Sequence, residues 1–310
     1  MVMMKVPAQH SKKDEEEFRI CTINVNNIWY LQDILHNFFL ITFMKINLAC
    51  GHTLPLFCIQ YSHWIEILYT DRNFVICAPT GSGKTVMFEL AITRLLMEVP
   101  MPWLNIKIVY MAPIKALCSQ RFDDWKDKFG PVGLSCKELT GDTVMDDLFE
   151  IQHAHIITTT PEKWDSMTRK WRDNSLVQLV RLFLIDEVVH VVKDESRGAT
   201  LEVVVSRMKT IQSSLSRISE NPDTLTPMRF VAVSATIPNA EDIAEWLSDG
   251  MRPAVCLKID ESHRPVKLRK IVLGFPCSSN QTEFKFDLTL NYKIASVIQT
   301  YSEQKPTLVV

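Results

Sequence analysis

The stretch that most constrains this chain runs from position 73 to position 85, with the sequence NFVICAPTGSGKT. Its apolar part, Phe74 to Cys77, predicts a short buried strand, and the apolar repeat from Val86 to Met97 predicts a helix. A loop that contains Gly81 and Gly83 lies between the two. Strand, glycine loop and helix in that order form a phosphate cradle. Glycine lets backbone N–H groups approach an anion, and the helix N-terminus adds the positive end of its dipole.

This cradle predicts a site for ATP and Mg²⁺. We expect Lys84 to reach the β- and γ-phosphates and the Thr85 hydroxyl to bind Mg²⁺. A chance Gly-Lys-Thr turn is the alternative, and the flanking strand and helix argue against it. The general pattern has glycine where this chain has Ala78. The residues expected to contact the cofactor here are Ala78, Pro79, Thr80, Gly81, Ser82, Gly83, Lys84 and Thr85.

Composition bounds the class of protein. The 310 residues are 46% hydrophobic and 23% charged, so the chain can bury a core as one large or two modest domains. A net charge of −2 gives no whole-chain attraction to nucleic acid, so such binding needs local patches. The eight cysteines are scattered without a CxxC pair, which predicts neither a zinc site nor a disulfide framework and favours a reduced, intracellular compartment. The first 18 residues lack a signal-peptide core, and no apolar run is long enough to cross a membrane.

Three regions follow from the pattern along the chain. Residues 1–55 are a poorly defined extension, residues 56–258 alternate strands with helices, and residues 259–310 are a connector and the start of another domain. The alternation predicts an α/β fold with a mostly parallel sheet and helices on both faces. Further predicted strands are Ile106 to Met111, a weak one near Leu134, His155 to Thr159, Leu182 to Ile185, Phe230 to Val233, Lys270 to Phe275 and Thr307 to Val310. Further predicted helices run from Ala116 to Phe129, from Pro161, from Leu201 to Ile218, from the cap Asn239 to Leu247, and from Tyr292 to Tyr301.

Two motifs at strand ends predict chemistry. Asp186 and Glu187 follow a buried strand, so one carboxylate can position Mg²⁺ and the other can orient and deprotonate the attacking water. A surface acidic pair is the alternative. Ser234-Ala235-Thr236 follows another strand and carries two hydroxyls that can bond to the acidic site.

Other motifs offer donors for a phosphate backbone. The run from Thr158 to Trp164 combines hydroxyls, a helix N-terminus and a lysine, although an ordinary capped helix has the same pattern. Pro113, Lys115 and Arg121 invite the same interpretation. Gln60 can bond to an adenine edge, or it is simply a solvated side chain.

In this order, the motifs resemble the first motor domain of superfamily 2 helicases of the DExH class, and especially the superkiller-like group. The resemblance rests on APTGSGKT, MAPIKAL, TTPEKWD, RGATLE at 197–202 and HRPVKL at 263–268, and it covers positions 56 to 310. Within the group, the chain is most similar to helicases that promote crossovers in meiosis. The resemblance implies a RecA-like domain, the start of a second one, ATP-dependent unwinding of nucleic acid, and a nuclear location. DNA and 3′-to-5′ movement are favoured.

The resemblance also implies roles for single residues. Gln60 would contact adenine, Asp186 would hold Mg²⁺ with Thr85, and Glu187 would be the catalytic base beside Lys84. The residues that would couple hydrolysis to movement are Ser234, Thr236 and His190. The residues that would line the nucleic-acid track are Pro113, Lys115, Thr140, Gly141, Thr160, Pro161 and Arg197.

Three departures from the family pattern bear on function. The acidic motif is D-E-V-V-H instead of D-E-x-H, so His190 falls one residue late, and an extended backbone would turn it to the opposite face unless a bulge absorbs the extra residue. The residues before Leu56 do not match, and the chain ends where a second motor domain would begin. We therefore expect weak ATP binding and very slow hydrolysis. A non-hydrolysing fragment that binds nucleotide or nucleic acid is the alternative. A small-molecule P-loop kinase is disfavoured by Ala78 and because TTPEKWD and Ser234-Ala235-Thr236 have no role in that chemistry.

Overall fold

The computed structural model describes residues 66–99, 103, 105–141, 145–188, 195–218, 227–260, 269, 271–277, 281–307 and 309. It divides into two compact units, Met1–Val266 and Lys267–Val310. Gln60, His190 and the predicted extension 1–55 lie outside the described residues, so their predictions stay predictions. None of the described helices is both long and apolar enough to cross a membrane.

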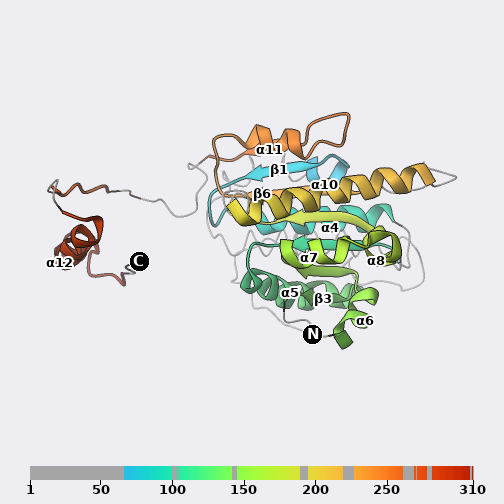
Figure 1. Ribbon diagram of the computed structural model, residues 1–310, viewed down its shortest axis with the longest axis horizontal. Helices are drawn as coiled ribbons and strands as arrows, with labels where there is room; N and C mark the ends of the chain where they lie inside the picture. Colours follow the sequence, from blue (N-terminus) through green and yellow to red (C-terminus); the bar gives the residue numbers. More distant parts are fainter. Residues whose placement is uncertain are drawn as a thin grey trace, which may run out of the picture. The chain divides into compact units, whose positions relative to one another are not determined.

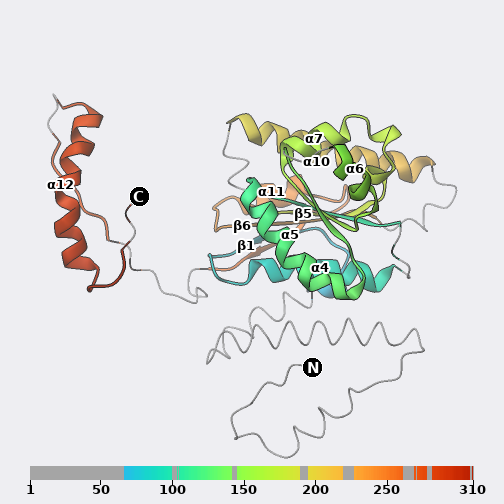
Figure 2. The ribbon, with the colours of Figure 1, turned by 90° about the horizontal axis from the view of Figure 1, so that it is seen from below.

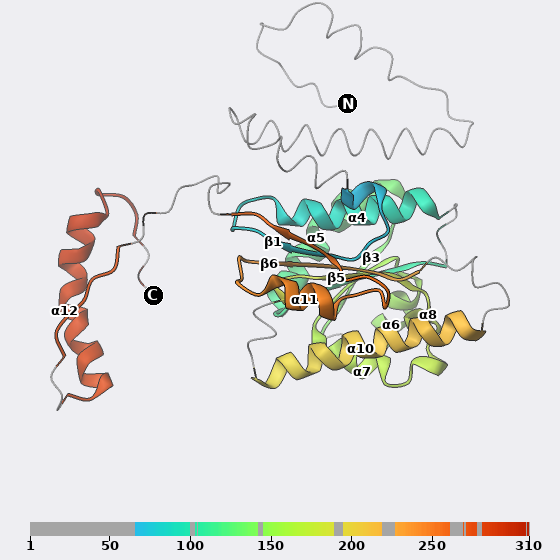
Figure 3. The ribbon, with the colours of Figure 1, turned by 90° about the horizontal axis from the view of Figure 1, so that it is seen from above.

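The first unit is built on a sheet of seven parallel strands, which Figures 1 and 3 show from two sides. The strand order is β3-β4-β2-β5-β6-β1-β7. The strands are β1 (Phe74–Cys77), β2 (Lys107–Met111), β3 (Cys136–Leu139), β4 (Ile156–Thr159), β5 (Val180–Ile185), β6 (Arg229–Ser234) and β7 (Val255–Lys258). The predicted fold class, a parallel sheet with helices on both faces, is confirmed.

Helices cover both faces of this sheet (Figures 2 and 3). One face carries α4 (Lys84–Glu98) and α5 (Lys115–Phe129), with the short 3-10 helix η1 (Gly130–Val132) after α5. The other face carries α6 (Met145–His153), α7 (Pro161–Thr168), α8 (Ser175–Gln178), α10 (Glu195–Ile218) and α11 (Ala240–Trp246), and the 3-10 helix η2 (Trp171–Asp173) precedes α8.

Strand residues divide between two cores by alternation. Phe74 and Ile76 pack in the core under α4 and α5, whereas Val75 and Cys77 pack in the core on the opposite face. A strand buried on both faces has no polar side, which is why β1 is a continuous apolar run.

The differences from the predicted elements are local. The helix α4 starts at Lys84, two residues before its apolar repeat, and α6, α8 and β7 were not predicted. Asn239 does precede α11, but its side chain makes no capping bond and instead donates to Asp242 Oδ2 at 3.1 Å. That cap prediction is therefore wrong in its chemistry.

The second unit contains α12 (Glu283–Tyr301), and the predicted helix there is confirmed with an earlier start. Thr282 supplies that start, because its hydroxyl accepts a bond from the Lys285 backbone at 3.4 Å. The predicted strand at 270–275 is wrong: residues 271–277 are exposed and belong to no strand. A strand needs a neighbour for its backbone groups, and the described residues of this unit supply none. Thr307 and Val309 likewise lie outside any strand.

Candidate nucleotide site at the carboxyl edge of the sheet

The loop between β1 and α4 has the backbone that a phosphate cradle needs. Gly81 and Gly83 have φ of 85° and 84°, in the left-handed region that glycine adopts without strain. Ser82 is buried and closes the loop, because its hydroxyl donates to the Pro79 carbonyl at 2.7 Å. Lys84 then opens α4, and the first turn of that helix contains no acidic residue. The Val86 N–H donates to the Gly83 carbonyl at 3.0 Å, and the N–H groups of Lys84 and Thr85 before it are the donors for an anion.

The acidic pair of β5 meets this loop. The distance between Lys84 Nζ and Glu187 Oε1 is 3.3 Å, and the two side chains are 14% and 25% exposed. The structure thus brings the lysine of the cradle and the carboxylates at 186–187 to one place, although 103 residues separate the two positions in sequence. Glu187 has φ of 48°, which is unusual for a residue with a side chain and costs about 1–2 kcal/mol. Strained backbone of this kind is concentrated at functional sites.

Asp186 lies deeper and is held through both carboxylate oxygens. Its Oδ2 accepts a bond from the Tyr110 hydroxyl at 2.6 Å, and its Oδ1 accepts one from the Glu187 backbone N–H at 2.9 Å. Its own N–H donates to the Met111 carbonyl at 2.8 Å and extends the pairing of β5 with β2. Burial raises the pKa of the Asp186 carboxyl. Burial also raises the pKa of the Tyr110 phenol above its ordinary value, so the phenol remains a donor at neutral pH.

Arg121 of α5 approaches the same place. Its Nη2 lies 3.4 Å from Thr85 Oγ1, and its guanidinium lies 5.9 Å from the centroid of the Tyr110 ring. Nη1 of the same guanidinium pairs with Asp124 Oδ2 at 3.1 Å. The sequence pattern predicts Arg121 as a nucleic-acid contact, whereas the structure places it beside Thr85 of the cradle.

Tyr110 was not predicted as a site residue. One signal was available: it is the only hydroxyl-bearing side chain in the buried strand KIVYM. A tyrosine in such a position needs a partner for its O–H, and that need points toward a polar site at the strand end.

The oxygen atoms that meet here suit Mg²⁺. The Thr85 hydroxyl and the carboxylates of Asp186 and Glu187 are hard oxygen donors, and Mg²⁺ is usually held by one or two carboxylates together with substrate phosphates. In the described part of the chain, no group of three or more His, Cys, Asp or Glu side chains is placed to hold a metal ion.

Ser234 ends β6 next to this site, and its predicted bond to the acidic pair is not formed. Its carbonyl accepts the Ala78 N–H at 3.1 Å, which joins β6 to the cradle. Its side chain is fully buried and Oγ has no hydrogen-bond partner. Thr236 is exposed. A buried hydroxyl without a partner costs about 1–3 kcal/mol, so Ser234 is a residue that stability alone does not explain.

The residues predicted to contact nucleic acid lie at other strand ends of the same edge. Pro113 and Lys115 follow β2, Thr140 and Gly141 follow β3, and Thr160 and Pro161 follow β4. The nucleotide residues instead follow β1, β5 and β6. Because the order is β3-β4-β2-β5-β6-β1-β7, the edge has two halves that meet between β2 and β5.

Among the residues after β3, β4 and β2, the contacts show which side chains are exposed and which are held in place. Arg197 at the start of α10 donates to Glu162 Oε1 at 2.7 Å and also to the Pro113 carbonyl, so it joins the loops after β2 and β4. Lys115 and Gly141 are exposed. Thr140 is buried and its hydroxyl donates to Glu138 at 3.2 Å, so its side chain is not presented to a ligand.

Thr158 is fully buried in β4. The interpretation of its hydroxyl as a donor to nucleic acid is therefore wrong, and only the residues after the strand end remain candidates.

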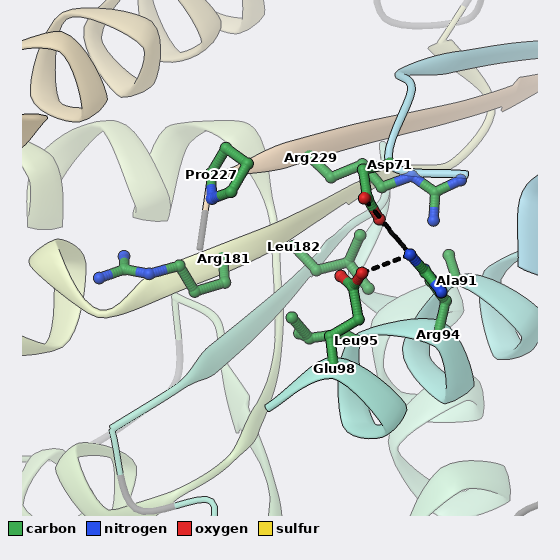
Figure 4. A pocket seen from close by; sticks show the side chains of 9 residues that line it. All are labelled: Asp71, Ala91, Arg94, Leu95, Glu98, Arg181, Leu182, Pro227 and Arg229. Carbon is green, nitrogen blue, oxygen red and sulfur yellow. Dashed lines mark hydrogen bonds and ion pairs between the residues drawn. The ribbon is translucent and has the colours of Figure 1, made fainter. Parts of the chain in front are cut away.

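A separate cavity lies at the amino edge, at the opposite end of the strands (Figure 4). It measures about 20 Å³, which is enough for one water molecule. The Arg229 guanidinium at its wall donates to the Arg72 and Ile67 carbonyls at 2.7 and 2.9 Å, and burial lowers the pKa of Arg229 to about 10. Arg94 binds Asp71 and Glu98 nearby, as the dashed lines in Figure 4 show. These contacts tie α4 to the start of β1 and lie away from the cradle.

Comparison with known proteins finds relatives that align with about four fifths of this chain. Over 251 residues the chain is 86% identical to a human protein named "Probable ATP-dependent DNA helicase HFM1". This alignment covers 81% of this chain and 17% of the human protein. Over 246 residues it is 42% identical to "ATP-dependent DNA helicase MER3" of Saccharomyces cerevisiae, covering 79% and 19%. The chain thus spans about a fifth of the length of these relatives.

A solved structure shares the fold. The crystal structure of the DUF1998 helicase MrfA bound to DNA aligns with a TM-score of 0.51 at 21% identity, covering 64% of this chain and 27% of that one. The model of the DEAD/DEAH box helicases matches residues 59–243, more than half of the 310. This chain therefore belongs to the DEAD/DEAH box helicase family.

Proposed function

We propose that this chain is the first motor domain of an ATP-dependent DNA helicase, and that it binds ATP–Mg²⁺ and a single strand at the two halves of its carboxyl edge. The observation that carries the proposal is the 3.3 Å contact between Lys84 and Glu187, which joins the phosphate cradle to the acidic pair. The names of the relatives, both ATP-dependent DNA helicases, support ATP as the nucleotide and DNA as the strand.

We call the half of the edge after β1, β5 and β6 the nucleotide half, and its side chains take distinct roles. Lys84 binds the β- and γ-phosphates, Thr85 and Asp186 hold the metal, and Glu187 orients the attacking water. The metal, when bound, neutralises charge on the phosphates. Gln60 as the adenine contact and His190 as a coupling residue complete the set as predictions outside the described residues. Ser234 and Thr236 couple the site to strand movement, and the unpartnered Ser234 hydroxyl is free to take a new acceptor when the domain changes state.

Lys84 has to change partners during the cycle. Its ammonium pairs with Glu187 at 3.3 Å, and the phosphates attract the same ammonium more strongly because they carry more charge. When Lys84 moves to the phosphates, the Glu187 carboxylate is released from this ion pair and can turn toward the attacking water. Nucleotide binding thereby prepares the base for hydrolysis.

We call the half of the edge after β3, β4 and β2 the strand half, and its described residues include a positive helix end and the exposed Lys115 ammonium. The helix α5 starts at Lys115 and has no acidic residue in its first turn, so its N-terminus and the Lys115 ammonium can both meet a phosphate. Arg197 keeps the neighbouring loops together through Glu162 and the Pro113 carbonyl. We propose 3′-to-5′ movement, a nuclear location and a role in meiotic recombination from the similarity to the crossover-promoting helicases.

Two variants separate the halves. In titrations of this chain with a fluorescent ATP analogue, Lys84→Ala is expected to lose about tenfold to a hundredfold in affinity, since a hydrogen bond to a charged group contributes about 1.5–3 kcal/mol. Lys115→Ala should keep nucleotide affinity but weaken single-stranded DNA binding equally for all sequences, and lower the slope of log affinity against log salt by about 0.7.

The matched control is Lys126→Ala, which removes a cation from α5 that lies over Phe122 at 5.6 Å. It should change neither affinity. Unchanged ATP affinity in Lys84→Ala would overturn the proposed nucleotide site. If Lys115→Ala bound DNA as tightly as the wild-type chain at all salt concentrations, the proposed DNA site would be overturned.

A further inference from the structure

The carboxylate of Asp186 is oriented by two neutral donors. The Tyr110 hydroxyl lies 2.6 Å from Oδ2 and the Glu187 N–H lies 2.9 Å from Oδ1. A carboxylate offers about four lone-pair positions, so two remain for a further ligand. Neutral donors fix the direction of those positions without cancelling the negative charge, which is what a group that binds a cation requires.

The Tyr110 hydroxyl is itself fixed in place. Its ring is fully buried, and it meets Phe88 of α4 edge-on at 5.8 Å and Trp125 of α5 edge-on at 5.3 Å. The Arg121 guanidinium lies 5.9 Å from the ring centroid, and the same group reaches Thr85. The ring therefore packs between the helix that follows the cradle and the helix that starts at Lys115.

We propose that Tyr110 is a positioning residue for the metal–nucleotide site, whose hydroxyl holds Asp186 in the orientation that accepts Mg²⁺. This inference rests on the proposed function, because it requires that Asp186 holds the metal of a nucleotide complex. Groups that orient a metal-binding side chain typically contribute a factor of 10–100 to metal affinity or activity. A tyrosine that served packing alone would affect the stability of the chain without distinguishing metal-bound from metal-free nucleotide.

Tyr110→Phe removes only the hydroxyl and keeps the ring contacts. We expect the variant to bind a fluorescent ATP analogue in EDTA as the wild-type chain does. With saturating Mg²⁺, the strengthening of binding should be smaller than in the wild type by about 10-fold to 100-fold.

The matched control is Thr158→Val. Thr158 pairs with Tyr110 across β2 and β4, is fully buried on the same sheet, and carries a hydroxyl with no hydrogen-bond partner. The control removes a buried hydroxyl one strand away and should keep the full effect of Mg²⁺.

A double-variant cycle tests whether Tyr110 acts through Asp186. In an Asp186→Asn background, Tyr110→Phe should cause no further loss of the Mg²⁺ effect, because the group that it orients has gone. Thermal unfolding of each variant separates loss of fold from loss of metal binding.

The outcomes separate this role from the site itself. Tyr110→Phe with the wild-type Mg²⁺ effect, or with equal weakening in EDTA and in Mg²⁺, would overturn the positioning role and leave the nucleotide site standing. A wild-type chain whose nucleotide affinity is the same with and without Mg²⁺ would overturn the proposed metal site, and the role of Tyr110 with it.

Discussion

Lys84 Nζ and Glu187 Oε1 lie 3.3 Å apart, so the proposed phosphate ligand and the proposed base share one ion pair. The carboxylate and a nucleotide compete for the same ammonium. Partly exposed ion pairs contribute up to about 1 kcal/mol, which corresponds to roughly fivefold in affinity.

Glu187→Gln should therefore bind ATP more tightly than the wild type, by up to about fivefold, while hydrolysing it more slowly. Titration calorimetry measures the affinity. Glu98→Gln at the far end of α4 is the control and should not change it. Weaker binding by Glu187→Gln would show that the carboxylate assists the nucleotide instead of competing with it.

Asp186→Asn is expected to stabilise the chain at neutral pH. Burial raises the pKa of Asp186, so the folded chain holds this proton more tightly than the unfolded chain does. Protonation of Asp186 stabilises the folded chain. This stabilisation is fully present below the pKa of Asp186 in the unfolded chain, about 4, and is lost as the pH rises through the higher pKa of the folded chain. Above that range the buried charge lowers stability, and removing it should add about 0.5–2 kcal/mol.

Urea unfolding between pH 4 and pH 8 measures this effect. The free energy of unfolding of Asp186→Asn should exceed that of the wild type at pH 7, with the difference shrinking toward pH 4. A variant that is less stable than the wild type at pH 7 would mean that the bonds from Tyr110 and Glu187 outweigh the cost of burying the charge.

Glu89→Ala should loosen α4 from α5. Glu89 is 6% exposed and binds both the Trp125 indole N–H, at 3.3 Å, and the Lys128 ammonium. Its removal leaves the buried indole N–H without this acceptor, at a cost of about 1–3 kcal/mol in the free energy of unfolding.

Glu98→Ala is the matched control, because Glu98 ends the same helix and pairs with Arg94 nearer the surface. Exposed pairs of this kind contribute up to about 1 kcal/mol. Equal losses in the two variants, measured by denaturant titration, would contradict the importance of the buried contact.

Gly83→Ala should destabilise the chain by about 1–2 kcal/mol. Gly83 has φ of 84°, where a side chain is disfavoured, and an added Cβ would meet no atom within 4 Å, so the cost is purely conformational. Gly130→Ala is a fair comparison: it has equal space but φ of −52° and should be neutral or stabilising by up to about 1 kcal/mol. Similar melting temperatures for the two variants would refute the conformational argument.

Much of the fold could be predicted because buried parallel strands are short apolar runs. The strand at 74–77 and the ends of its neighbours follow from that pattern, and the phosphate loop, the acidic pair and Ser234 all lie at strand ends. The strand expected at 270–275 was wrong, because KIVLGF has the right composition but pairing with a neighbour is not a local property. The helix α6 carries three acidic residues in nine positions, which weakens its apolar repeat.

The site was only partly predictable for a related reason. Lys84, Thr85 and the pair at 186–187 carry a local signature of residue type and spacing. The bond from Tyr110 to Asp186 joins positions 76 apart, and the approach of Arg121 to Thr85 spans 36. Such contacts depend on which strands become neighbours, and the order β2-β5 is a property of the folded sheet.

The hydrogen bond from the Asp186 N–H to the Met111 carbonyl directly joins the two halves of the edge. Met111 lies four residues before Lys115, and Asp186 lies one residue before Glu187. If DNA binds after β2 as we propose, a backbone shift of that loop would be transmitted to Asp186 and Glu187 through this one hydrogen bond. By thermodynamic reciprocity, if bound DNA raises the affinity for the nucleotide by some factor, bound nucleotide would raise the affinity for DNA by the same factor.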